Sequence, residues 1–169
     1  MSINIDYFAL KKDVKVPSSF VIAPQDAINK ERADLVLTGD PEADLAAIQQ
    51  AIHDLHNARE STNIAIRIDF LGGTIDVGTK TDGNAIVIPV GYNNIHLYGN
   101  GVKLTGEVYD SDYNETYSVF TNNANNVIID GFNIVNNVSD YYGYGLSNTG
   151  TNCTITGNTC SSDYGDGLY

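Results

Sequence analysis

The sequence predicts an all-β solenoid, specifically a right-handed parallel β-helix, with an N-terminal capping α-helix. The first indication is a repeated block of polar turn, short apolar strand, glycine and second short strand. This block occurs at 93–102, 125–134 and 151–160. The second indication is the spacing of the strands before each block, which align on Val87, Val119, Leu146 and Leu168, at separations of 32, 27 and 22 residues. Short strands at such a period, separated by Asn and Gly, indicate stacked coils of about 22 residues, because one coil cannot bury its apolar face alone.

Alignment of the blocks on their glycine predicts which side chains face the core. The predicted stacks are Ile95, Val127 and Cys153; Leu97, Ile129 and Ile155; and Val102, Ile134 and Cys160. We therefore expect both cysteines to be free buried thiols, which behave as small apolar groups, and we expect no metal site from this pair. The turn asparagines suit left-handed backbone, and their stacked amides are suited to bonding along the solenoid axis. These asparagines are Asn93, Asn94, Asn125, Asn126 and Asn152.

Before the repeats, residues 1–32 show no sustained period and contain two prolines, so we expect an N-terminal arm or attachment segment. A partly disordered terminus is the alternative. A short strand follows at 33–37, and the solenoid is expected to occupy 33–169. Asp40 as N-cap and Pro41 at the first helical position predict a helix over 41–57.

The predicted helix has one apolar stripe, formed by Leu45, Ile48, Ile52 and Leu55. Its histidines, His53 and His56, are expected at the solvent-facing side or the rim. From Asn63 the period changes to two, which predicts strands. The expected strand segments are 64–69, 74–77 and 86–89, with a turn at Gly72-Gly73.

Charge and composition exclude several classes of protein. A chain of 169 residues suffices for one domain. Its net charge is −12, and residues 104–169 contain eight acids and no Lys or Arg. Phosphate binding needs those cations, so we expect neither a nucleic-acid nor a membrane partner. No secretory signal is visible at the N-terminus, and no apolar stretch is long enough to span a bilayer.

Several motifs resemble the pectate-lyase-like β-helix proteins over roughly residues 33–169. They are Ala33-Asp34-Leu35-Val36 with Gly39, Asp44, Ile48 and Ala51-Ile52; Gly72-Gly73-Thr74-Ile75; the strand from Ile86 to Pro89; and the coil from Ile95 to Gly101. The resemblance implies a right-handed β-helix. It does not imply an activity, since this fold hosts lyases, hydrolases, epimerases, phage tail spikes and adhesins.

The catalytic patterns of that family do not carry over to this chain. Its lyases use a basic residue, often beside calcium held by aspartates, and its hydrolases use clustered aspartates with a histidine. Here no Lys or Arg follows Lys103, the last histidine is His96, and no adjacent Asp-Asp pair occurs. Catalytic residues are therefore unknown. The end at Tyr169, within a coil, predicts a fragment of a longer protein, and any activity is expected in coils beyond residue 169.

The variable turns, at 107–117, 139–144 and 163–166, are the candidate functional surface. Stacked coils place them in one row rich in tyrosine and carboxylate, which suit sugar faces and sugar hydroxyls. The candidate carbohydrate-contact residues are Tyr109, Asp110, Asp112, Tyr113, Tyr117, Asp140, Tyr141, Tyr142, Tyr144, Asp163, Tyr164 and Asp166. Ordinary solvated turns are the alternative. The same acids have oxygens that suit Ca²⁺, but they lack a calcium-loop spacing, and no other cofactor is expected.

The sequence is consistent with three functions. The first is a virion or cell-surface structural protein, a phage tail spike or fibre that contacts host polysaccharide, with a homotrimer implied by the resemblance. The second is a polysaccharide lyase, hydrolase or epimerase with its active site in later coils. The third is a structural solenoid without a ligand.

Overall fold

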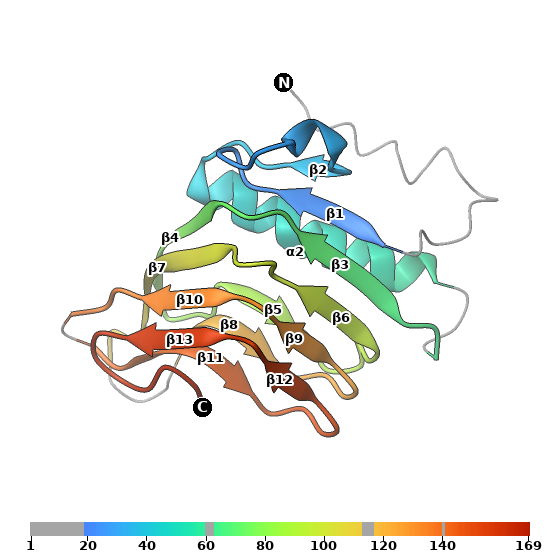
Figure 1. The fold of residues 1–169 in the computed structure, drawn as a ribbon. Helices are drawn as coiled ribbons and strands as arrows, with labels where there is room; N and C mark the ends of the chain where they lie inside the picture. The colour runs from blue at the N-terminus through green and yellow to red at the C-terminus, as the bar shows by residue number, and fades with distance from the viewer. Residues whose placement is uncertain (1–18, 60–62, 113–116, 140) are drawn as a thin grey trace.

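The computed structural model describes residues 19–59, 63–112, 117–139 and 141–169 and shows a parallel β-solenoid with one α-helix near its N-terminus (Figure 1). This confirms the predicted fold class, while the handedness of the winding stays a prediction. Sheet A contains, in spatial order, β12 (Thr154–Thr156), β9 (Ile128–Asp130), β6 (Ile95–Tyr98), β3 (Ile66–Phe70), β1 (Phe20–Ala23) and β2 (Leu35–Val36). Sheet B contains β13 (Thr159–Ser162), β10 (Asn133–Asn136), β7 (Lys103–Tyr109) and β4 (Thr74–Thr81). Sheet C contains β11 (Gly143–Asn148), β8 (Tyr117–Asn122) and β5 (Ile86–Ile88).

The register of sheets A and B confirms part of the predicted core. Leu97, Ile129 and Ile155 are aligned on neighbouring strands, as expected. The stack predicted for Val102 is wrong, because Ile134 and Cys160 align with Leu104 instead. The turn between β6 and β7 is two residues longer than the equivalent turn between β9 and β10, so alignment on one glycine does not carry into the following strand.

The register of sheet C also differs from the prediction. Ile86, Phe120, Leu146 and Leu168 are aligned, at separations of 34, 26 and 22 residues. Val87 and Val119 are therefore each one position away from this row of aligned residues. In β8, Val119 is 0% exposed and Phe120 is 1% exposed, so alternation of apolar residues does not identify the inward face of this strand. The last coil length of 22 residues is unaffected.

The first sheet begins earlier in the chain than expected. Strand β1 and the 3₁₀ helix η1 (Lys30–Arg32) lie within the predicted arm, and β1 pairs in parallel with both β2 and β3. Phe20 and Ile22 are buried in the core. Four consecutive apolar residues before a proline show no alternation and are too short a pattern to identify as a strand from the sequence. Residues 1–18 lie outside the described residues.

The helix α2 (Pro41–Ala58) matches its predicted limits closely and contacts β4 and β5, the first strands of sheets B and C (Figure 1). Asp40 caps it by accepting a hydrogen bond from the backbone N–H of Ala43 at 2.9 Å. Gln49 pairs with the backbone of Val87, donating from Nε2 to the carbonyl at 2.8 Å and accepting from the N–H at 3.0 Å. The helix thus pairs backbone groups at the open edge of β5. In an exposed edge strand these groups would lack a protein partner.

The short turns into sheet A use asparagine in two ways. Asn94, Asn126 and Asn152 have left-handed backbone, with φ of 59°, 56° and 55°, as expected. Asn93 and Asn125 do not share this conformation, and their side chains bond along the solenoid axis. Oδ1 of Asn93 accepts the N–H of Asn125 at 2.9 Å, and Oδ1 of Asn125 accepts the N–H of Thr151 at 2.9 Å. These bonds connect the turns of successive coils along the solenoid axis.

Both cysteines are free, as predicted, but Cys153 and Cys160 are half-buried and not fully buried. Both cysteines lie on the last described coil and pack against the core cluster. Burial raises the pKa of the Cys160 thiol above its ordinary value.

Candidate functional site

Ring contacts between tyrosines join the variable turns of neighbouring coils. Tyr109 stacks on Tyr141, with ring centroids 4.5 Å apart and planes inclined by 13°. Tyr142 contacts Tyr164 at 5.1 Å with an inclination of 59°. These distances are close to the separation of about 4.8 Å between paired strands, so the solenoid spacing itself brings the rings together. We call Tyr109, Tyr141, Tyr142 and Tyr164 the tyrosine ridge.

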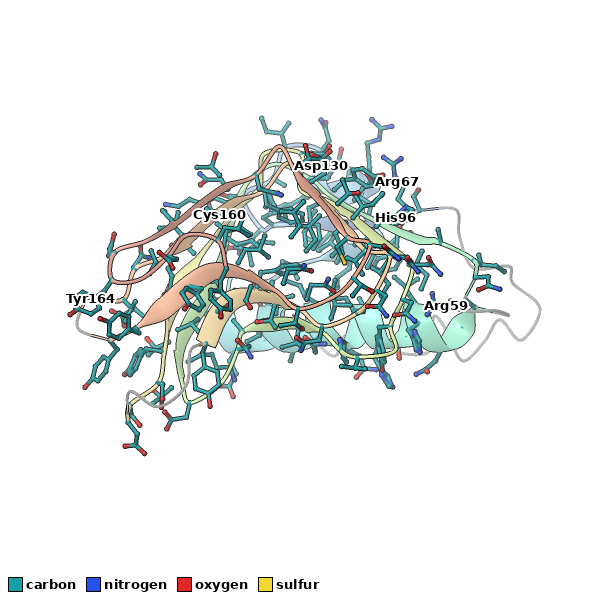
Figure 2. The ribbon with its side chains drawn as sticks, turned by 90° about the horizontal axis from the view of Figure 1, so that it is seen from below. Arg59, Arg67, His96, Asp130, Cys160 and Tyr164 are labelled. Carbon is teal, nitrogen blue, oxygen red and sulfur yellow. The ribbon has the colours of Figure 1, made fainter. Side chains whose placement is uncertain are left out.

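The ridge contains two kinds of ring. Tyr109 and Tyr141 are half-buried, and each covers one face of the other. Tyr142 and Tyr164 are 54% and 45% exposed, and their tilt prevents full face-to-face coverage. Figure 2 places Tyr164 at the outer margin of the molecule, on the side opposite Arg59. The second pair therefore presents aromatic surface to solvent, while the first pair connects two coils.

A third pair lies at sheet C, where Tyr144 stacks on Tyr169 at 4.7 Å with an inclination of 5°. Tyr169 is exposed and was absent from the predicted candidates. The signal was present in the sequence, since the alignment of Leu168 with Leu146 places Tyr169 on the coil that follows β11. The variable turn that predicts the candidates spans 163–166 and ends before this residue.

The predicted carboxylates do not all face solvent. Asp112, Asp163 and Asp166 are exposed. Asp110 is only 6% exposed, and its Oδ1 accepts the backbone N–H of Asp112 at 3.1 Å. Asp110 thus shapes its turn and does not offer a free carboxylate to a ligand.

The remaining predicted positions are in the strand or outside the described residues. Tyr117 is half-buried as the first residue of β8, where it aligns with Gly143. Tyr113 and Asp140 lie outside the described residues.

The ridge is an acidic environment. In the part of the chain that the structure describes, the one ion pair is between Arg67 and Asp69 on sheet A, so Glu107, Asp112, Asp163 and Asp166 have no lysine or arginine within salt-bridge distance. Glu107 is exposed beside the turn, at the end of β7. Exposed carboxylates without a cation produce a negative potential over this surface.

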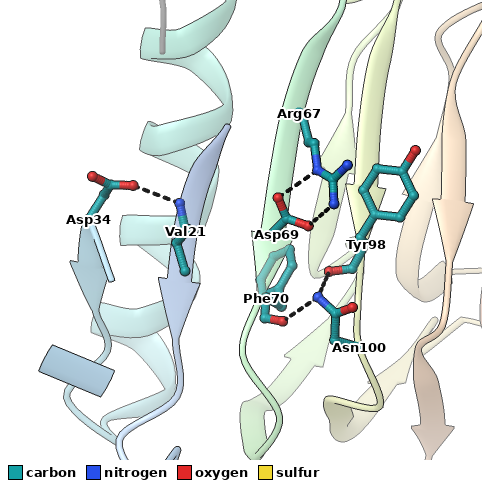
Figure 3. A network of polar contacts seen from close by, with 7 residues as sticks. All are labelled: Val21, Asp34, Arg67, Asp69, Phe70, Tyr98 and Asn100. Atoms are coloured by element: carbon teal, nitrogen blue, oxygen red, sulfur yellow. Dashed lines mark hydrogen bonds and ion pairs between the residues drawn. The ribbon is translucent and has the colours of Figure 1, made fainter. Parts of the chain in front are cut away.

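A second polar surface, which the sequence did not predict, lies on the outer side of sheet A (Figures 2 and 3). Strand register places Arg67 beside His96 and Asp69 beside Tyr98, and Tyr98 lies beside Asp130 on the next strand. Arg67 donates from Nε and Nη2 to Asp69 at 2.7 and 2.8 Å, and its guanidinium lies 4.3 Å from the ring centre of Tyr98. We call these five residues the sheet A cluster.

The electrostatics of the sheet A cluster are set by the pair of Arg67 and Asp69. The hydrogen bond and the charge of Asp69 raise the pKa of Arg67. Burial and the positive charge of Arg67 lower the pKa of His96. Asp69 occupies the Nε and Nη2 donors of Arg67, so this bidentate edge of the guanidinium is already used. Beside the cluster, Asn100 donates from Nδ2 to the carbonyl of Phe70 at 2.9 Å (Figure 3).

The helix histidines belong to a third polar group, at the end of α2. His53 is exposed as expected, and its Nδ1 lies 2.6 Å from Oη of Tyr92. His56 is half-buried and stacks on Tyr92, with centroids 3.8 Å apart. Arg59 Nη2 lies 2.7 Å from His56 Nδ1, and arginine is only a donor, so this nitrogen must accept. Burial, and then the charges of Arg59 and His53, lower the pKa of His56.

Among the described residues, the acids and histidines do not form a metal centre. Across the described ranges, no three His, Cys, Asp or Glu residues are grouped so that they could hold a metal ion. Within the same ranges, no helix combines the length and apolar character required to cross a membrane. A hollow of about 680 Å³ opens between the start of α2 and β4, lined by residues that include Glu42, Gln49, Thr79 and Lys80.

Comparisons with protein-family models, with curated proteins and with solved structures each find no match. The resemblance to pectate-lyase-like proteins therefore rests on the sequence motifs alone, and the parallel solenoid rests on the structure of this chain.

Proposed function

We propose that this chain is a carbohydrate-binding structural solenoid, of the kind found in phage tail spikes and fibres, and that it contacts polysaccharide through the tyrosine ridge. The observation that carries the proposal is the pair Tyr142 and Tyr164. Two coils supply one ring each, both rings are about half exposed, and their centres are 5.1 Å apart.

Tyrosine suits this role because its ring is a rigid apolar surface with a polar tip. Sugar rings combine an apolar face with a rim of hydroxyls. The exposed carboxylates Asp112, Asp163 and Asp166, on the same turns, are acceptors for those hydroxyls. A rigid parallel sheet under the turns keeps the rings in place, so little conformational entropy is lost on binding.

The proposal includes an assembly and a location. The resemblance to tail spikes implies a homotrimer that is part of a virion or of a cell surface. Light scattering of the purified chain tests the trimer, because a trimer has three times the mass of the 18.3 kDa chain. A clean monomer at micromolar concentration would contradict that part of the proposal and leave the ligand to be tested separately.

Glycan binding is tested with a double variant, Tyr142→Ala with Tyr164→Ala, measured by calorimetry or on a glycan array. We expect the affinity to fall about tenfold or more, which corresponds to a loss of about 1.4 kcal/mol. The matched control is Tyr98→Ala, which removes a tyrosine from the sheet A cluster and should leave glycan affinity unchanged. If the double variant keeps its thermal stability and binds as the unaltered chain does, the ridge is not the contact surface.

A further inference from the structure

We infer that the glycan bound by the tyrosine ridge carries protonated amines, so that the ligand class is an amino-sugar polymer and not a polyuronate. This inference rests on the proposed function, because it assigns a ligand class to the same surface. It departs from the substrates of the lyases that the sequence motifs resemble, which bear carboxylates.

The charge distribution argues against an anionic ligand. Residues 104–169 contain eight acids and no Lys or Arg, and they supply all of the ridge. The exposed carboxylates of Asp112, Asp163 and Asp166 have no lysine or arginine of the described chain within salt-bridge distance. A uronate, phosphate or sulfate placed there would face like charges, and no described lysine or arginine is paired with them, which disfavours its binding.

The same features favour an ammonium group. Tyrosine faces attract cations through the ring quadrupole, and this attraction is largest where the ring is partly desolvated. Tyr142 and Tyr164 are partly buried rings whose faces are incompletely covered. Asp163 immediately precedes Tyr164 in the chain, and its backbone N–H bonds to the carbonyl of Asn136 at 3.0 Å, which ties this turn to the coil before it. A protonated amine at this position would contact an aromatic face and would be attracted by the negative charge of nearby carboxylates.

The spacing of coils extends this environment along the axis. Tyr109 with Tyr141, and Tyr142 with Tyr164, join three successive turns that follow β7, β10 and β13. Each turn contributes at least one exposed acid or tyrosine among the described residues. A polymer with an amine on every residue therefore encounters contacts on more than one coil, which increases its apparent affinity relative to a monomer.

The test compares three oligosaccharides of equal length: a hexosamine oligomer with free amines, the same oligomer N-acetylated, and a uronic-acid oligomer. Binding to the 169-residue chain is measured at mildly acidic pH, with a chelator present to remove metal ions. It is measured at low and at high salt. We expect the free-amine oligomer to bind about tenfold more tightly than its N-acetylated form at low salt. The difference should largely disappear near 1 M salt, where the Debye length is about 3 Å.

A charge variant separates the amine contact from general binding. Asp163→Asn with Asp166→Asn removes two charges and keeps an amide oxygen at each position as an acceptor for hydroxyls. The ratio of the affinities for the free-amine and N-acetylated oligomers should therefore fall from about tenfold to about one, because any change in hydroxyl contacts affects both oligomers alike. If the uronic-acid oligomer binds as tightly as the amine oligomer, the inference is wrong while the proposed function stands. If none of the three oligomers binds, both fail.

Discussion

The ring of Tyr109 lies against the ring of Tyr141, with centroids 4.5 Å apart, although 32 positions separate the residues in the chain. Tyr109 ends β7, and Tyr141 follows β10, the next strand of sheet B. The solenoid therefore aligns aromatic residues in turns of different length, and this contact joins two coils outside the main core.

Tyr109 and Tyr141 should be energetically coupled. Stacked aromatic pairs contribute about 0.5–1.5 kcal/mol beyond their buried area. A double-mutant cycle with Tyr109→Ala and Tyr141→Ala, measured by urea unfolding, should give a coupling free energy in that range. The same cycle between Tyr141→Ala and Tyr98→Ala is the control and should be additive within about 0.5 kcal/mol. Additivity in both cycles would show that the stack does not stabilise the coils.

The register of sheet A predicts opposite results for two neighbouring isoleucines. Ile129 is fully buried between Leu97 and Ile155, whereas Ile128 faces outward beside His96. Ile129→Asp places an unpaired charge in the core and should prevent folding or cost at least about 4 kcal/mol. Ile128→Asp should change the melting temperature little. Circular dichroism of both variants checks this, and equal effects would contradict the register.

Two asparagines at the same turn should differ in their contribution to stability. Asn122 is fully buried, donates to the carbonyl of Ala124 at 3.1 Å and accepts the N–H of the same residue at 3.1 Å. Asn122→Ala leaves the N–H of Ala124 unpaired and leaves its carbonyl with only the weak S–H donor of Cys153 at 3.4 Å. The substitution should cost about 1–3 kcal/mol. Asn125 is exposed, and Asn125→Ala should cost only about 0.5–1.5 kcal/mol. Chemical denaturation measures both, and the reverse order would contradict the inward placement of Asn122.

Stability should fall as the pH drops below the ordinary histidine pKa of about 6.5. The folded state lowers the pKa of His56 and of His96, so below that pH the unfolded chain binds protons that the folded chain resists. The contribution is complete above about pH 6.5 and is lost on acidification through the lowered folded values. Urea midpoints at pH 7.5, 6.5 and 5.5 measure it. In the variant His56→Gln with His96→Gln the slope over this interval should flatten, and an unchanged slope would assign it to other groups.

The repeated blocks and the helix signals were sufficient to predict the solenoid from the sequence. Asp40 and Pro41 marked the start of α2, because the cap requires those residue types. Register in sheet C was not predictable, since Val119 and Phe120 are both buried and alternation distinguishes faces only when one face is solvated. Likewise, β1 is a strand because β3 and β2 pair with it, and not because of its own pattern.

The candidate site was predictable in outline. Turn composition indicated that the tyrosines of successive coils would be adjacent, but not which rings would pair or that Asp110 would be buried. The sheet A cluster was missed for a different reason. Arg67 and Asp69 lie on β3, before the first repeated block, so only the register of β3 with β6 reveals that they meet His96 and Tyr98.

The central claim is that the tyrosine ridge is the ligand surface. The most direct test is an NMR titration of the isotope-labelled chain with the free-amine hexosamine oligomer. We predict that backbone amide shifts concentrate at Tyr141–Tyr142 and at Asp163–Asp166, while the amides of Arg67, His96 and Tyr98 stay unchanged. Shifts centred on the sheet A cluster, or no shifts at millimolar oligomer, would contradict the claim.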